Sequence, residues 1–166
     1  MKNVLPKLLT AQTQLDQPAR LFDAVENTCA DLFGFTFLTI LQTLPNTNNV
    51  VRVHSSTPDD YPVGALKPMG GTPWGNVVID DRKTWLGNTP DEVLWAFPDA
   101  QLILSKGCEA CACAPVIWNG TTRGILSLNA PRDSYAIDDV GKMSQIAQML
   151  LPAFIAPPLT KKEPSE

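Results

Sequence analysis

The dipeptide Asn119-Gly120 constrains this chain more than any other local feature. It separates two stretches rich in apolar and β-branched residues, Ala112 to Trp118 and Thr122 to Asn129. Asparagine and glycine readily adopt the positive φ angles of a type I′ turn, which joins adjacent antiparallel strands. The sequence therefore predicts a β-hairpin at residues 112–129.

A second hairpin is predicted nearer the N-terminus. Residues 35–44 and 50–54 are rich in Phe, Thr, Ile, Leu and Val, and the turn formers Pro45 to Asn49 separate them. Two shorter elements are also expected. Residues 102–104 are predicted to form a short strand, and residues 76–79 a short helix or strand.

Helical patterns flank the predicted strands. The first begins after Asp16, a candidate N-cap, tolerates Pro18 in its first turn and ends at Gly34. The second begins at Asp138 or Asp139 and ends before Pro157-Pro158. Each carries an apolar stripe at three- and four-residue spacing; the residues are Leu21, Phe22, Val25, Cys29, Leu32 and Phe33 in the first, and Val140, Met143, Ile146, Ala147, Leu150, Leu151 and Phe154 in the second.

Composition indicates one soluble domain. The 166 residues are 44% hydrophobic, enough for a single core over residues 1–156, and the polar segment 157–166 is predicted to be a disordered tail. The net charge of −4, with no basic run longer than Lys161-Lys162, argues against nucleic acid as a ligand. No stretch of eighteen apolar residues and no signal-type h-region occurs, so we expect a cytoplasmic protein with no membrane partner.

The middle of the chain is irregular but apolar. Residues 55–101 hold six of the 15 prolines and three of the four tryptophans. Loops that carry such side chains must bury them, and aromatic loops over a sheet commonly enclose a small ligand. The alternative is a proline-stiffened cover with no ligand beneath it.

Three of the four cysteines, Cys108, Cys111 and Cys113, fall within six residues. If 110–117 is a strand, Cys111 and Cys113 share a face, and alternate positions about 6.6 Å apart would strain a disulfide between them. One interpretation is that they pack as small hydrophobes. Alternatively they act as redox thiols, or they bind zinc or an iron–sulfur cluster with Cys29 or His54 as a fourth ligand.

Several short motifs, taken in order, resemble the GAF domain family. They are Ala114-Pro115-Val116, the hairpin Gly120, Gly124-Ile125-Leu126-Ser127-Leu128-Asn129, and Tyr135-Ala136-Ile137-Asp138-Asp139 before the last helix. The resemblance spans about Leu15 to Phe154. It implies an α+β fold related to PAS domains, with an antiparallel sheet, the terminal helices on one face and a loop-covered pocket on the other. It also implies a homodimer formed through those helices, or a separate regulatory partner protein.

The expected function is the binding of a small molecule for regulation rather than catalysis, with an unidentified ligand or cofactor. The pocket is predicted to lie under residues 57–100 and over the strand 108–115. Strand alternation places Arg52 and His54 on one face, where they could recognise an anionic group together. The predicted ligand-binding residues are Arg52, Lys67, Tyr61, Trp74, Phe97, Cys111, Cys113 and Ser127.

One enzymatic branch of the resembled family, the free methionine-R-sulfoxide reductases, deserves comparison because it uses cysteine chemistry. A reductase cysteine would fall near Gly70 to Gly75, where this chain has Trp74, and a second near Leu102 to Ser105, where it has no cysteine. The resemblance therefore does not extend to this activity.

Overall fold

The computed structural model describes residues 4–155 of the chain. The elements, in chain order, are α1 (Val4–Gln12), α2 (Ala19–Leu32), β1 (Phe37–Thr43), β2 (Asn49–Ser55), β3 (Leu66–Pro68), α3 (Pro73–Gly75), the π-helical turn η1 (Asn76–Asp80), β4 (Trp85–Gly87), α4 (Pro90–Ala96), α5 (Ala100–Ser105), β5 (Ala110–Trp118), β6 (Thr121–Ala130), α6 (Asp139–Gln148) and α7 (Leu151–Ile155).

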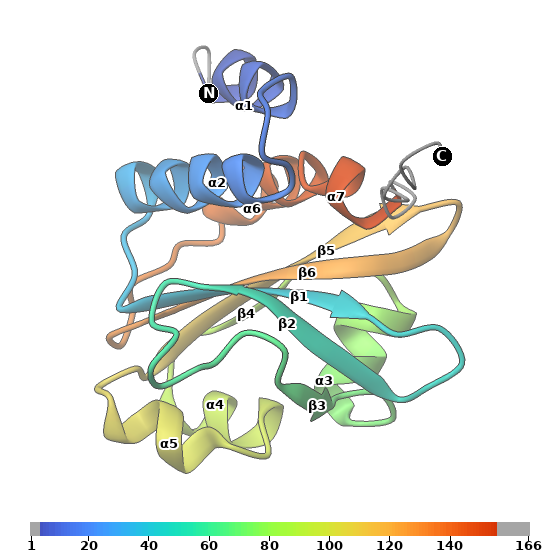
Figure 1. Cartoon of the computed structure of the whole chain (residues 1–166). Helices are drawn as coiled ribbons and strands as arrows, with labels where there is room; N and C mark the ends of the chain where they lie inside the picture. The colour runs from blue at the N-terminus through green and yellow to red at the C-terminus, as the bar shows by residue number, and fades with distance from the viewer. Residues whose placement is uncertain (1–3, 156–166) are drawn as a thin grey trace.

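The strands form one antiparallel sheet in the order β3-β2-β1-β6-β5-β4. Figure 1 shows the sheet between two layers: α2, α6 and α7 cover one face, and α3, α4 and α5 lie on the other. The β5–β6 hairpin turns at Asn119 and Gly120, whose φ angles of 50° and 69° are those of the predicted type I′ turn. The predicted α+β architecture and both hairpins are confirmed.

The two faces of the sheet carry separate cores. On the helical face, β5 contributes Ala110, Ala112 and Ala114, whose small side chains let α6 pack closely. On the opposite face the same strand contributes Cys111 and Cys113. The predicted alternation of β5 is therefore confirmed.

Some local predictions are wrong at the ends of helices. Asp16 has a φ of 62° and contributes its backbone carbonyl, not its side chain, to the start of α2. The predicted last helix is divided at Met149 and Leu150 into α6 and α7, because Pro152 has no N–H to donate within a continuous helix. Pro157-Pro158 and the predicted tail lie outside the described residues.

Two short segments also differ from prediction. Residues 102–104 belong to helix α5, because the turn begun at Asp99 lets Leu102 and Ile103 donate hydrogen bonds to its carbonyl oxygen. Helix α1 was not predicted; its Leu8 is fully buried against α2. Residues 76–79 do form a helical turn, η1.

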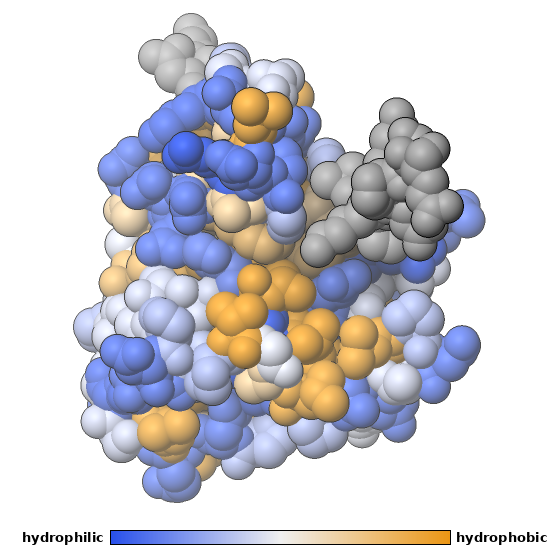
Figure 2. All heavy atoms as spheres, viewed as in Figure 1, coloured by the Kyte–Doolittle hydropathy of each residue, from blue (hydrophilic) through white to orange (hydrophobic). Residues whose placement is uncertain are grey.

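The surface of the face seen in Figure 2 is uneven. Hydrophilic residues cover most of the outer helices, whereas hydrophobic residues gather over the region of β1 and β2. Exposed apolar side chains in the adjoining segment include Val63 and Leu66. Within residues 4–155, no helix combines the length and apolar character needed to cross a membrane.

Candidate functional site

A small cavity lies between the sheet and the segments that cover it on the face opposite the terminal helices. Its volume is about 20 Å³, room for about one water molecule. The lining comes from β1, β2, β3 and β6, from the lid (α3, η1, α4, α5 and their connections) and from the loop before β3. The lining residues are Phe37, Thr39, Leu41, Arg52, Tyr61, Lys67, Met69, Trp74, Phe97, Ile103, Ser127 and Asn129.

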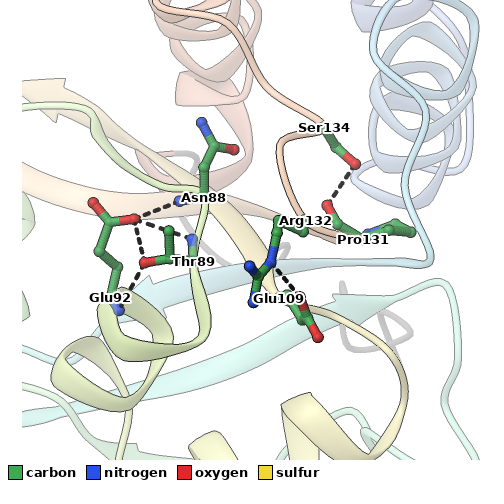
Figure 3. Close-up of polar contacts among 7 residues, drawn as sticks. All are labelled: Asn88, Thr89, Glu92, Glu109, Pro131, Arg132 and Ser134. Atoms are coloured by element: carbon green, nitrogen blue, oxygen red, sulfur yellow. Dashed lines mark hydrogen bonds and ion pairs between the residues drawn. The ribbon is translucent and has the colours of Figure 1, made fainter.

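Local sequence signals build the lid. Thr72 caps α3 by accepting a hydrogen bond from the Gly75 N–H at 3.0 Å, with a proline at the first helical position. Thr89 and Glu92 form a capping box at the start of α4 (Figure 3). Figure 3 also shows Arg132 reaching Glu109, a contact of 2.7 Å between Nε and Oε2.

Arg52 is the buried cation of the cavity. Its residue is only 7% exposed, its Nη1 donates to the Pro62 carbonyl oxygen at 3.0 Å, and its guanidinium carbon lies 5.1 Å from the Tyr61 ring centre. Burial lowers the pKa of the guanidinium, and the nearby Asp99 carboxylate opposes that shift. Because an arginine pKa is far above neutrality, the group remains charged.

His54 does not join Arg52, contrary to the prediction from strict alternation. The register of β1 and β2 shifts at Ile40 and Leu41, so Val53 is an extra residue between Arg52 and His54. His54 therefore faces the helical layer, where its Nε2 lies 2.6 Å from Glu26 Oε2. Its partners there make it part of the contact between β2 and α2.

Lys67 is the second cation of the cavity, and it is paired. Its Nζ lies 2.7 Å from Asp99 Oδ1 and 5.0 Å from the Phe97 ring centre. Both charged side chains are mostly buried, 18% and 29% exposed. This ion pair ties β3 to the start of α5.

Aromatic side chains form walls of the cavity. Tyr61 stacks on Phe37 with ring centres 4.3 Å apart, and Trp74 lies 5.8 Å from Phe97. Trp85 packs edge-on against Phe97 at 5.8 Å. Pairs of this geometry add stability beyond the area they bury, so these walls are well fixed.

Four residues that line the cavity carry buried polar atoms without a partner. Among the residues described, no hydrogen bond is made by Arg52 Nε, Tyr61 OH, Trp74 Nε1 or Asn129 Oδ1. Burial raises the pKa of Tyr61, so its hydroxyl keeps its proton. Each unpaired buried group costs about 1–3 kcal/mol. Several of them around one cavity are therefore a concentration of unsatisfied polarity that a bound water or ligand would relieve.

Cys111 and Cys113 lie behind the cavity rather than in its lining. Their sulfurs are 3.6 Å apart, and Ser127 Oγ lies 3.6 Å and 3.4 Å from them. All four cysteines are free and buried, and burial raises the pKa of Cys111. The predicted floor at 108–115 is wrong, because β6 separates β5 from the cavity and the floor is formed by β1 and β6.

The alternative metal set is not brought together. Cys29 belongs to the core on the helical face, whereas Cys108, Cys111 and Cys113 belong to the core on the opposite face. The sheet separates the two groups. Within residues 4–155, no cluster of three His, Cys, Asp or Glu side chains is placed to hold a metal ion.

Of the predicted site residues, Arg52, Tyr61, Lys67, Trp74, Phe97 and Ser127 line the cavity, and the two cysteines do not. Among the polar lining residues, sequence reasoning missed Thr39 and Asn129; the apolar ones that it missed are Phe37, Leu41, Met69 and Ile103. A signal was available, since alternation places Asn129 on the same face of its strand as Ser127. Asp99 was missed as well, because it reaches the cavity only through its ion pair with Lys67.

No family model matches the chain, and no curated protein matches it in sequence. Solved structures do resemble it. The GAF domain of a phosphoenolpyruvate-protein phosphotransferase from Acinetobacter superposes with a TM-score of 0.69 at 12% identity, covering 92% of this chain and 93% of that one. The GAF domain of a two-component sensor histidine kinase from Bacillus halodurans gives 0.65 at 14%, covering 83% and 93%. The chain has a GAF-like fold.

This GAF-like fold is shared with an enzyme too. The free methionine-R-sulfoxide reductase from Neisseria meningitidis superposes with a TM-score of 0.62 at 16% identity, covering 92% of this chain and 87% of that one. Folds of this kind host different functions, so function has to be argued from the site.

Proposed function

We propose that this GAF-like chain is a sensory domain that binds a small molecule in the cavity and regulates a partner. The observation that carries the proposal is the set of four buried polar atoms without partners around one cavity, one of them on a guanidinium. Natural proteins leave such atoms unpaired rarely, and where they do, a ligand or ordered water is a common reason. The sensory role is supported by structural neighbours from a sensor histidine kinase and a methyl-accepting chemotaxis protein.

Ligand binding requires the lid to move. Typical ligand pockets enclose about 300–1,000 Å³, whereas this cavity encloses about 20 Å³. The lid is attached by ion pairs of 2.7 Å between Lys67 and Asp99 and of 2.6 Å between Lys106 and Asp60. We infer that the structure is the closed state of a two-state domain, and that occupancy shifts the balance between the states.

The output is proposed to pass through a homodimer or a separate partner protein. The helical layer offers exposed apolar side chains for such contacts, including Leu9 on α1, Leu32 on α2 and Ile155 on α7. Analytical ultracentrifugation would detect the dimer. A purely monomeric chain at all concentrations would leave only a separate partner.

Thermal-shift screening with mixtures of small metabolites tests the binding proposal. Arg52→Gln removes the buried cation, and Arg132→Gln is the matched control because Arg132 is exposed and remote from the cavity. At least one mixture should raise the melting temperature of the wild type and of the control but not of Arg52→Gln. If no mixture stabilises the wild type and native mass spectrometry finds no retained ligand, the proposal is wrong.

A thiol-based redox sensor is the second candidate, favoured by the 3.6 Å contact between the sulfurs of Cys111 and Cys113. Thiol titration of the native protein tests it. A redox sensor requires that these two thiols react faster than Cys29, whose pKa burial raises to about 12. Equally slow reaction of all four thiols would exclude this role.

A further inference from the structure

The carboxylate of Asp99 is paired with a cation that lines the cavity. It lies 2.7 Å from Lys67 Nζ, and it raises the pKa values of both Arg52 and Tyr61, which line the same cavity. Asp60, on the loop beside Tyr61, is paired at 2.6 Å with Lys106 instead. Asp99 therefore faces two cavity cations, Arg52 and Lys67, while it can neutralise only one.

The charge balance of the site favours a monoanion. With Arg52 and Lys67 positive and Asp99 negative, one positive charge remains uncompensated. A buried charge is costly unless it is paired. A single carboxylate balances it, whereas a phosphate monoester carries about −1.5 to −2 at neutral pH and would leave excess negative charge.

The unpaired atoms define the polar groups that the ligand must present. Arg52 Nε and the protonated Tyr61 hydroxyl are donors that a carboxylate can accept from, and Asn129 Oδ1 is an acceptor. A hydroxyl or ammonium group next to the carboxylate can donate to that amide oxygen. Apolar side chains such as Met69 and Ile103 suit the small remainder of the molecule.

We propose that the ligand is a small monocarboxylate with a hydroxyl or ammonium group on the adjacent carbon, and that Asp99 is a built-in competitor that holds Lys67 until this ligand arrives. The inference rests on the function proposed above. When the ligand carboxylate takes over Lys67, Asp99 loses this ion pair but stays at the edge of the site, so the two cations and the two anions still balance. Because Asp99 lies at the start of α5, the loss of its ion pair loosens the attachment of the lid and links occupancy to lid movement.

The competition predicts an unusual effect of a conservative change at Asp99. Asp99→Asn keeps the shape of the side chain but removes the competing charge, so the binding-competent fraction rises and affinity for the carboxylate increases by about three- to ten-fold. Lys67→Gln and Arg52→Gln remove the cations and weaken binding. Asp91→Asn is the matched control: it removes the same charge from an exposed position on α4 and leaves affinity unchanged.

Isothermal calorimetry of the full chain and these four variants tests the inference with glycolate, lactate, glycine and alanine as probes. Acetate tests whether binding needs the hydroxyl or ammonium group next to the carboxylate. Inorganic phosphate tests whether the site prefers a carboxylate to another anion. Circular dichroism checks that each variant is folded. We expect lactate-type or glycine-type probes to bind, acetate to bind more weakly, phosphate not to bind, and Asp99→Asn to bind more tightly than wild type.

The outcomes separate this inference from the function on which it rests. Binding of phosphate or of uncharged metabolites alone, blocked by Arg52→Gln, overturns the ligand class and leaves a ligand-binding sensor. Carboxylate binding that Asp99→Asn weakens or leaves unchanged overturns the competitor role. If Asp99→Asn does not fold, Lys67→Gln provides the test instead. Tighter carboxylate binding by Lys67→Gln than by the wild type would show that Lys67 does not bind the ligand, and would contradict the competition between Asp99 and the ligand for Lys67. Failure of every probe and every metabolite mixture to bind removes the proposed function itself.

Discussion

The two cores of this protein, on opposite faces of one sheet, differ in how they treat polar groups. On the helical face, two buried polar side chains are satisfied: Tyr135 OH donates to the Gly34 carbonyl oxygen at 3.3 Å, and Thr28 Oγ1 to the Ala24 carbonyl oxygen at 2.7 Å. On the lid face, Arg52, Trp74 and Asn129 keep unpaired atoms among the described residues. The first core specifies the fold, and the second gives up some stability where we place the function.

The largest expected effect tests the helical-face core. Leu128 is fully buried there in the middle of the sheet, and Leu128→Ala should lower the free energy of unfolding by about 2–5 kcal/mol through lost burial and a new cavity. Urea denaturation measures this. Leu66→Ala is the control, because Leu66 is 61% exposed and its truncation should change stability by less than about 0.5 kcal/mol.

The next effect concerns the close packing of Gly75, at the end of α3 in the lid, against the backbone that follows β3. A Cβ on Gly75 would overlap the Met69 carbonyl oxygen, a backbone atom that cannot rotate away. Gly75→Ala should therefore destabilise the lid by about 1–3 kcal/mol. Gly141, on α6, has open space around it, so Gly141→Ala should be neutral or stabilising in the same denaturation series. Equal effects of the two changes would contradict the account.

A change of opposite sign is expected at the unpaired amide. Asn129 is 2% exposed, and Asn129→Leu keeps the branched shape and the number of side-chain heavy atoms while removing a buried polar atom that has no partner among the described residues. Stability should rise by about 1 kcal/mol, and affinity for the ligand should fall. Thermal denaturation and calorimetry measure the two quantities. A loss of stability would mean that the amide is already satisfied in the unliganded protein.

The smallest effect is a pH dependence at the start of α4. Hydrogen bonds from the Asn88 N–H and from Thr89 lower the pKa of Glu92 (Figure 3). A carboxyl whose folded pKa is depressed stabilises the fold above its unfolded pKa, about 4.3, and this contribution is lost as the pH falls through the lower, folded value. The protection factors of the α4 amides, which correct exchange rates for the pH dependence of intrinsic exchange, should therefore fall on acidification, and Glu92→Gln should remove that dependence.

Sequence reasoning reached the fold because local and global signals agreed at particular residues. Asn119-Gly120 fixed the β5–β6 hairpin, and alternation along Ala110 to Pro115 assigned both faces of β5 correctly. It failed where tertiary geometry overrides periodicity. The extra residue Val53 in β2 separates Arg52 from His54, and nothing local in the sequence marks that bulge.

The sequence predicted half of the residues that line the candidate site, but not how the strands and the lid arrange them. Six of its residues were found: five are aromatic or cationic side chains that stand out in the sequence, and Ser127 was chosen as a small residue for the floor. The position of Cys111 and Cys113 one strand beyond the cavity depends on the sheet order, which joins β1 to β6 across most of the chain. The ion pair between Lys67 and Asp99 likewise joins residues that only the folded lid brings together.

The most direct measurement is a crystal structure of the protein grown with millimolar lactate. We predict that the lactate carboxylate lies against Arg52 and Lys67, that its hydroxyl donates to Asn129, and that Asp99 is withdrawn from Lys67. An empty or water-filled cavity, with Asp99 still on Lys67 and the polar atoms of Arg52, Tyr61, Trp74 and Asn129 all bonded to protein groups, would contradict it.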